Sequence, residues 1–269
     1  MSTTTHRSSA GSRERLATDA ALLRALHQIG DPLVLVNVWD AESARRVERS
    51  GGRAVATSSA AVAASLGLAD GNAMPPAAAF DALGRIAAAV AVPVTADLES
   101  GYGLSADELV DRLLAAGGVG LNLEDSDHGR PGELIEAAAA AERLAAVRES
   151  ATNSGVDVVV NARVDTYLHR GADPEQLLAE TVRRARIYVD AGADCVYPIR
   201  LADPLLIGQL TDELPGVAVN ANIAPSTTVP TLAAARVSRI SIGPQAHSLA
   251  MADLERRAAL LIGGGILDA

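Results

Sequence analysis

The sequence contains no lysine, so all 23 of its basic residues are arginine. Schiff-base aldolases and pyridoxal phosphate enzymes need a lysine amine, and a P-loop needs its lysine to bind phosphate. These three large classes are therefore excluded. The single cysteine, Cys195, rules out an intrachain disulfide and a cysteine-cluster metal site. Sparse cysteine also favours a cytoplasmic location.

Aromatic residues make up only 2% of the chain, and the net charge is −10. An acidic protein gains nothing from the attraction to phosphates that drives nucleic-acid binding, and so few aromatic rings offer no platform for stacking bases. The sequence also lacks an uncharged run of about 18 apolar residues, which a membrane-spanning helix would need. We therefore expect no nucleic-acid partner and no membrane partner.

The chain has 269 residues, of which 49% are hydrophobic, and this is enough to bury a large core. The first twelve residues, "MSTTTHRSSAGS", are polar and of low complexity, and they lack the apolar run of a signal peptide or membrane anchor. This composition predicts a disordered tail over residues 1–15 and a single domain over residues 16–269.

Short β-branched segments alternate with alanine-rich helical segments along this domain. The expected strands cover residues 33–38, 54–58, 92–97, 119–124, 156–162, 194–198, 217–221 and 239–243. Strands that are apolar on both faces and separated by helices pair in parallel, and eight such units predict an α/β fold of the closed (β/α)8 (TIM) barrel type. An open doubly wound sheet is the alternative. An extra N-terminal helix, at residues 16–30, is expected to plug the bottom of the barrel or to pack on its outside.

The stretch "TADLESGYG" at residues 95–103 places Asp97 and Glu99 where a buried strand meets a glycine-rich turn. Active sites of (β/α)8 barrels lie at the C-terminal ends of the strands. If the strand stays extended to Glu99, both acids point the same way, and Glu124 on the next strand adds a third carboxylate. Oxygen ligands without histidine or cysteine favour Mg²⁺ or Mn²⁺ over zinc. We therefore predict a magnesium site in which one acid binds through water, with a helix N-cap as the alternative role of the acid pair.

Arg163, at the end of the fifth predicted strand, is placed to clamp a substrate carboxylate or phosphonate. The small turn at residues 57–61 offers backbone N–H groups to the same anion. Neutralising Asp165 or Glu124 is the alternative role for the arginine.

Two further residues have two interpretations each. The single tryptophan, Trp39, either contacts the substrate or packs in the core, and His128 in the loop "DSDHGRPGE" is either solvated or a mobile acid/base. Cys195 is expected to be a small buried hydrophobic residue rather than a nucleophile.

Together, the ordered motifs "SSAAVAASLGLADG", "TADLESGYG", "GLNLED", "NARVD", "AGADCVYP" and "ANI" resemble the isocitrate lyase / phosphoenolpyruvate mutase superfamily over about residues 33–250. The resemblance implies a (β/α)8 barrel, often a tetramer whose last helix is exchanged between subunits. It also implies Mg²⁺ and a small 2-oxo or 2-hydroxy carboxylate substrate that reacts through an enolate or related intermediate. We therefore expect a homo-oligomer, either a tetramer or a dimer.

The same resemblance assigns roles to individual residues. Asp97 becomes the metal ligand, with Glu99 and Glu124 around it, in part through water. Arg163 becomes the substrate-binding arginine. The resemblance also assigns substrate contacts to Thr57, Ser58, Ser59, Asp70 and Asn222, and Trp39 joins them because it follows the first predicted strand. The catalytic candidates are Arg163, Glu124 and His128, with Asp127 as the alternative proton donor in the loop.

Some residues depart from the superfamily patterns. The lyases carry a K-K-C-G-H loop where this chain has "DSDHGRPGE". The P–C bond mutases use an asparagine in the same loop, which is missing here, and a later histidine, at whose position this chain has Ile199. A Mg²⁺-dependent lyase or decarboxylase is the first hypothesis. A phosphorylmutase or phosphonopyruvate hydrolase is the second, and a barrel that binds a metabolite without turnover is the third.

Overall fold

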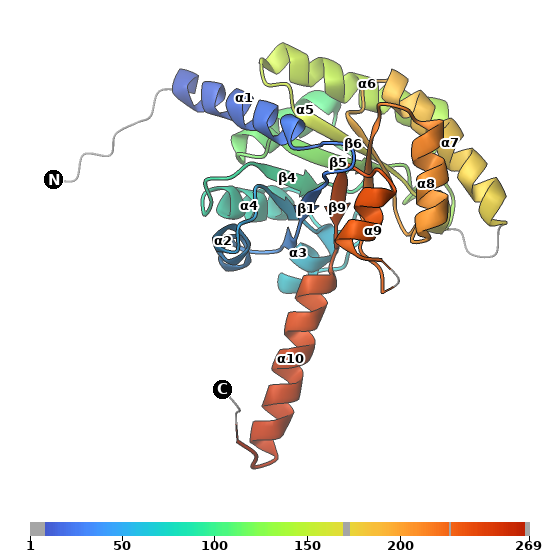
Figure 1. Cartoon of the computed structure of the whole chain (residues 1–269). Coiled ribbons are helices and arrows are strands. Elements are labelled where there is room, and N and C mark those ends of the chain that lie inside the picture. Colours follow the sequence, from blue (N-terminus) through green and yellow to red (C-terminus); the bar gives the residue numbers. More distant parts are fainter. Residues whose placement is uncertain (1–8, 169–172, 226, 267–269) are drawn as a thin grey trace.

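The computed structural model describes residues 9–168, 173–225 and 227–266. Within them, nine parallel strand segments form one sheet in the order β1-β9-β8-β7-β6-β5-β4-β3-β2. The segments β1 and β2 are two halves of the first barrel strand, interrupted at Val36, so the sheet has eight strand positions and nearly closes on itself inside a layer of helices (Figure 1). The predicted (β/α)8 barrel is confirmed.

All eight predicted strand regions overlap an observed strand. The segments are β1 (Leu33–Leu35), β2 (Asn37–Val38), β3 (Val55–Thr57), β4 (Val94–Asp97), β5 (Gly120–Glu124), β6 (Val159–Val164), β7 (Cys195–Pro198), β8 (Ala218–Asn222) and β9 (Arg239–Ser241). Nearly all of their residues are buried, because the barrel interior covers one face of each strand and the helices cover the other.

The helices follow the strands in alternation. They are α1 (Ser9–Ala25), α2 (Ala41–Arg49), α3 (Ser59–Ser65), α4 (Pro76–Ala87), α5 (Ala106–Ala115), α6 (Ala137–Ser154), the 3-10 helix η1 (Thr166–Leu168), α7 (Pro174–Asp190), α8 (Pro204–Glu213), α9 (Val229–Ala234) and α10 (Gln245–Ile262). Their starts follow ordinary capping chemistry. Ser105 and Glu108 form the capping box of α5, as the sequence "SADE" indicates, and α7 and α8 each have an aspartate cap followed by proline.

The Asn37 side chain hydrogen-bonds to two neighbouring segments of the barrel where the first strand is interrupted. The Asn37 amide donates from Nδ2 to the Thr57 carbonyl at 2.7 Å, and its Oδ1 accepts from the backbone N–H of Ile242 at 3.0 Å and of Gly243 at 2.9 Å. Asn37 is buried, so no water replaces these bonds easily. The side chain therefore joins β3 to the end of β9 across the first strand.

α1 closes the bottom of the barrel. Leu23 is fully buried, and its methyl group would lie 2.8 Å from a Cβ at Gly120 inside the barrel. Arg24 forms an ion pair of 3.0 Å with Asp194, just before β7. This confirms the predicted plug but corrects its bounds, because the helix begins at Ser9 and residues 9–15 are therefore helical rather than tail. Residues 1–8 of the predicted tail lie outside the described residues.

α10 extends away from the barrel from the end of β9, and none of its residues is buried (Figure 1). At its start, the His247 ring meets the edge of the Trp39 ring at a centroid distance of 5.0 Å. Among the helices in the described part of the chain, none is long and apolar enough to cross a bilayer.

Candidate active site

The candidate site lies at the C-terminal rim of the barrel. β4 ends at Asp97, which stands in register with Asn122 of β5, and Glu124 of β5 stands in register with Arg163 of β6. The predicted acids and the predicted arginine therefore come from three neighbouring strands, as a parallel barrel requires.

Asp97 is held on one side by the start of α3. Its Oδ2 accepts from the Ser59 backbone N–H at 3.3 Å and from the Ser59 hydroxyl at 3.0 Å, while its own N–H donates to the Thr57 hydroxyl at 2.9 Å. The other oxygen, Oδ1, is buried without a hydrogen-bond partner among the described residues. Thr57 and Ser59 thus orient Asp97 so that one oxygen stays available.

Glu99 reaches the site by a different route from the one predicted. The strand stops at Asp97, and Glu99 has a left-handed backbone with φ of 51°. Its carboxylate is nevertheless 2% exposed, and it accepts from the backbone N–H of Asn72. Burial raises the pKa of Glu99 to about 7, and the charges of Asp70 and Asp97 add to this shift. Its Oε1 has no partner among the described residues.

Glu124 pairs with the loop histidine and the strand arginine. Its Oε1 lies 2.6 Å from His128 Nε2, and its Oε2 forms an ion pair with Arg163. Burial raises the pKa of Glu124, although His128 and Arg163 oppose that shift. The bond to Glu124 raises the pKa of His128, with burial opposing. His128 is therefore part of the site and is well placed to hold a proton at Nε2.

The other loop candidate, Asp127, is occupied elsewhere. Its carboxylate accepts from Arg130 at 2.8 Å and from the Gly129 N–H at 2.9 Å. The bond to Arg130 lowers the pKa of Asp127. A carboxylate with a lowered pKa is a poor proton donor at neutral pH. His128 is consequently the better of the two loop candidates.

Arg163 has the partners that the alternative interpretation named. It binds Asp165 through Nε at 2.7 Å and Nη2 at 2.9 Å, in addition to its ion pair with Glu124. Burial alone would lower its pKa, but the two carboxylates outweigh burial and raise it. Asp165 is fixed in turn, because its N–H donates to Asp125 at 2.8 Å. Arg163 therefore neutralises both acids, and a substrate anion would have to compete for its guanidinium.

The predicted arrangement of three acids around one ion, with one of them bound through water, stays a prediction. Within the described ranges, no group of three or more His, Cys, Asp or Glu side chains is arranged to hold a metal. Glu124 is paired with His128 and Arg163, so of the three acids it is the one that best fits the predicted binding through water. The partnerless oxygens of Asp97 and Glu99 still fit Mg²⁺ or Mn²⁺, because Mg²⁺ takes one or two carboxylates and completes its shell with water.

The remaining predicted substrate contacts are spread around the rim. Ser58 is buried and caps α3 by accepting from the Ala61 N–H at 3.4 Å, so its hydroxyl has a structural role. Asn222 accepts from the Tyr197 hydroxyl at 2.5 Å. Asp70 lies in an exposed loop close enough to Glu99 to raise its pKa, and Trp39 packs against His247 of α10.

Sequence patterns did not single out four residues that shape the site, namely Asn72, Tyr102, Arg143 and Arg239. Asn72 binds Glu99, and its Oδ1 accepts from the Tyr102 N–H at 3.1 Å. Arg143 of α6 donates to the carbonyls of Ser100 and Leu104, both at 3.1 Å, and so holds the glycine-rich turn. The fourth, Arg239, is buried inside the barrel. Only Tyr102 lay within a quoted motif, and the other three gave no local signal.

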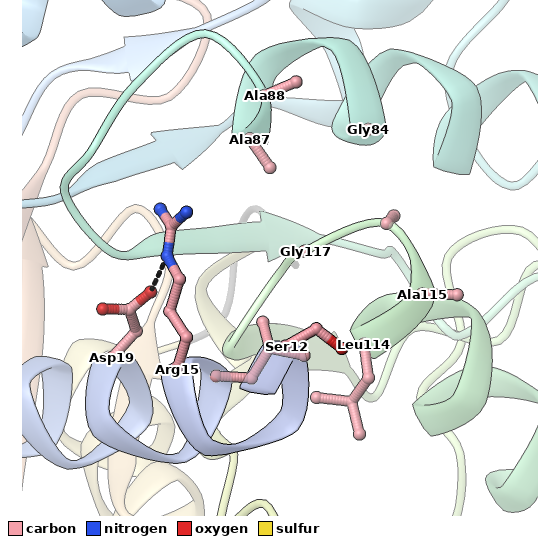
Figure 2. Close-up of a pocket in the computed structure, with 11 residues that line it drawn as sticks. Ser12, Arg15, Asp19, Gly84, Ala87, Ala88, Leu114, Ala115 and Gly117 are labelled. Carbon is pink, nitrogen blue, oxygen red and sulfur yellow. Dashed lines mark ion pairs between the residues drawn. The ribbon is translucent and has the colours of Figure 1, made fainter. Parts of the chain in front are cut away.

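A hollow of about 740 Å³ lies at the opposite end of the barrel, between α1 and the ends of α4 and α5 (Figure 2). Glycines and alanines line most of it, with the 3.5 Å ion pair of Arg15 and Asp19 on α1. The chain runs from these helix ends into β4 and β5, so the hollow faces the N-terminal ends of the strands, where barrels carry stability rather than catalysis. The candidate site therefore remains at the other rim.

Comparison with known families places this geometry in context. The family model described as phosphoenolpyruvate phosphomutase matches residues 23–262. The chain belongs to this family. The predicted resemblance to the isocitrate lyase / phosphoenolpyruvate mutase superfamily is thereby confirmed.

Several relatives of this family member align along most of its length. A candidate phosphonomutase from Burkholderia cenocepacia J2315 has 42% identity and a TM-score of 0.83, covering 90% of this chain and 99% of that one. An uncharacterised protein of Mycobacterium tuberculosis (strain H37Rv) is 36% identical over 224 residues, 83% of this chain and 82% of the relative. The 2-methylisocitrate lyase of Escherichia coli (strain K12) is 28% identical over 210 residues, 74% of this chain and 68% of the relative.

Proposed function

We propose that this protein is a divalent-metal-dependent lyase that breaks a C–C bond in, or decarboxylates, a small 2-oxo or 2-hydroxy carboxylate through an enolate-type intermediate. Membership of the family supports a lyase or mutase of small carboxylates. One observation carries the proposal: Asp97 and Glu99 each keep one buried oxygen without a hydrogen-bond partner among the described residues, at the rim where the charge of Asp97 also acts on Arg163.

Asp97 and Glu99 are the residues that would hold the metal. When bound there, Mg²⁺ or Mn²⁺ supplies Lewis acidity that stabilises negative charge on a 2-oxo oxygen. Ser59 and Thr57 keep Asp97 in one orientation before any ligand arrives, and such preorganisation lowers the cost of binding.

Arg163 supplies the cation for the substrate carboxylate. Its two-point bond to Asp165 fixes the plane of the guanidinium, and its contact with Glu124 leads directly to His128. A substrate carboxylate that displaces Glu124 from Arg163 would leave Glu124 and His128 as a pair sharing one proton. His128 Nε2 then delivers that proton to the carbanion carbon of the cleaved fragment.

The loop that carries His128 also covers the site. Ser126 bridges to Leu134 at its base, and His128 Nδ1 stands about 3.9 Å from where a Cβ at Gly71 would lie. Two loops therefore meet above the acids. We infer that this contact excludes water while the charged intermediate exists.

A phosphorylmutase or phosphonopyruvate hydrolase is the second candidate function. The candidate phosphonomutase that is 42% identical over 90% of this chain favours it. Both functions use the same acids and the same arginine, so they differ in the migrating group. Formation or loss of a phosphonate, followed by phosphorus NMR, distinguishes the mutase from the lyase.

The test is a screen of 2-oxo and 2-hydroxy diacids with Mg²⁺ or Mn²⁺, read by release of pyruvate or glyoxylate. We expect Asp97→Ala to lower kcat by about a hundredfold or more, because it removes the oriented metal ligand. Asp111→Ala, on the exposed face of α5, is the matched control and should keep full activity. Unchanged turnover in Asp97→Ala contradicts the metal mechanism, and no turnover of any substrate favours a binding barrel.

A further inference from the structure

Arg239 is an arginine buried inside the barrel without a charged partner. Its side chain belongs to β9 and is 1% exposed. Its Nη2 donates to Asn122 Oδ1 at 3.2 Å, whereas Nε and Nη1 have no hydrogen-bond partner among the described residues. A buried guanidinium with one neutral acceptor is an expensive arrangement, because desolvation of the charge is not repaid.

Two other largely buried arginines, Arg163 on β6 and Arg184 on α7, show what is missing. Arg163 pairs with Glu124 and Asp165, and Arg184 pairs with Asp125 at 3.0 Å. No ion pair involves Arg239 within the part of the chain that the structure describes. Its positive charge is therefore compensated only at longer range.

Three titratable groups near Arg239, Cys195, Tyr197 and His27, carry no negative charge at neutral pH. Burial raises the pKa of the Cys195 thiol and of the Tyr197 phenol to about 12 each, so both stay protonated. Burial and the charge of Arg239 lower the pKa of His27 to about 4, so His27 stays neutral. Arg239 thus gains no ionised partner from these three groups.

The positive charge of Arg239 acts on the inner end of the candidate site, through Asn122 and Asp97. Arg239 binds Asn122, and Asn122 stands in register with Asp97 on the adjacent strand. Adjacent strands are about 4.8 Å apart, and Arg239 reaches Asn122 through a hydrogen bond of 3.2 Å. With the lengths of the side chains included, the guanidinium therefore lies on the order of 10 Å from the Asp97 carboxylate. Burial lowers the pKa of Arg239, and the charge of Asp97 is one of the influences that oppose this shift, so the two groups attract each other.

We propose that Arg239 is a positioning residue whose buried positive charge, linked through Asn122 to the strand that neighbours Asp97, strengthens the binding of a carboxylate substrate and weakens the binding of the metal ion alone. The proposal deepens the proposed function and rests on it for the chemistry of the two ligands. The charge acts through space and through Asn122, without contact with the reacting atoms.

Charge logic separates this role from a packing role. At an effective dielectric constant of about 20 and a separation on the order of 10 Å, one unit charge changes the binding constant of a singly charged ligand by roughly tenfold. Removing the charge should therefore move anion and cation affinities in opposite directions. A merely structural defect would weaken both.

The experiment compares the wild-type chain with Arg239→Met, Arg239→Gln and Arg239→Lys. Calorimetry measures Mn²⁺ binding to the metal-free protein, and then oxalate binding at saturating Mn²⁺. For Arg239→Met we expect Mn²⁺ to bind roughly tenfold or more tightly and oxalate to bind roughly tenfold more weakly. Arg239→Lys keeps the charge and should stay near the wild type. The control Arg112→Met removes an exposed arginine of α5 and should change neither affinity.

Urea unfolding of the same variants supplies a second measurement. Because the buried charge lacks a partner, Arg239→Met should be at least as stable as the wild type. If neither Arg239→Met nor Arg239→Gln folds, the arginine is required for folding and the proposal is overturned. The same holds if both affinities fall together or neither changes.

The outcomes also separate this proposal from the proposed function. Opposite shifts in a protein that turns over no 2-oxo acid support the role of Arg239 and contradict the lyase. Turnover by the wild type with equal affinities in Arg239→Met contradicts the role of Arg239 alone. Absence of both Mn²⁺ and oxalate binding in the wild type contradicts both.

Discussion

Glu99 shows how burial changes the chemistry of one residue. Its carboxylate is inside the rim, beside Asp97 and Asp70, and its pKa rises to about 7. A metal ion needs the deprotonated carboxylate, so protons and divalent cations compete for Glu99 near neutral pH. Gln at this position would keep the shape and remove the competition.

The folded chain holds a proton on Glu99 more tightly than the unfolded chain, whose ordinary value is 4.5. The stabilising contribution of the protonated form is therefore complete below pH 4.5 and is lost as the pH rises through about 7. We expect the metal-free wild type to lose more unfolding free energy between pH 4.5 and pH 8 than Glu99→Gln does. Urea unfolding across this range measures the difference, and Mn²⁺ should restore stability at pH 8 in the wild type only. Identical pH profiles would contradict the raised pKa.

At the level of elements, the barrel strands were predictable and their ends were not. Alternating runs of β-branched and helical residues are local, so all eight strand positions could be located from the sequence. The end of β4 involves Asn72 instead, a loop residue 27 positions earlier in the chain. Its backbone N–H donates to the Glu99 carboxylate, and Glu99 has a left-handed backbone. The interruption between β1 and β2 likewise has no local signal, because Asn37 bonds to segments elsewhere in the chain.

Asn37→Ala tests that closure. It leaves the Thr57 carbonyl and the N–H groups of Ile242 and Gly243 without their buried partner. We expect a loss of about 3 kcal/mol in unfolding free energy, since each unsatisfied buried polar group costs about 1–3 kcal/mol and water recovers part of that. Denaturant unfolding measures it, with Asn153→Ala on the exposed face of α6 as the control. A loss no larger than that of the control would show that the joining of β3 to the end of β9 does not depend on Asn37.

At the scale of the whole molecule, α10 is one part that a single chain leaves uncovered. Leu249 is 72% exposed and Leu254 is 60% exposed, on a helix with no buried residue that extends from the barrel (Figure 1). Exposed apolar surface of this extent marks interaction sites. We propose that a second copy of the chain covers α10, in agreement with the expected homo-oligomer.

The double variant Leu249→Glu/Leu254→Glu should therefore lower the molar mass in solution from that of an oligomer to that of one 27.5 kDa chain. Charges buried in an apolar interface cost more than the contact returns. Light scattering after size-exclusion chromatography measures the mass. Leu22→Glu, at a leucine 47% exposed on α1, is the matched control and should leave the mass unchanged. A wild type that is already monomeric would contradict the proposal.

The parallel barrel, the acids and the arginine at its rim, and the exclusion of lysine-based chemistry could all be inferred from the amino-acid sequence. These follow from local periodicity and from the rule that parallel strands all end at one rim. The folded structure was needed to show that Glu124 pairs with His128 and Arg163, that burial raises the pKa of Glu99 to about 7, and that the buried Arg239 has no ion-pair partner among the described residues. The reason is that burial and pairing are set by side chains from distant parts of the chain, such as Arg239 and Asn122, 117 residues apart.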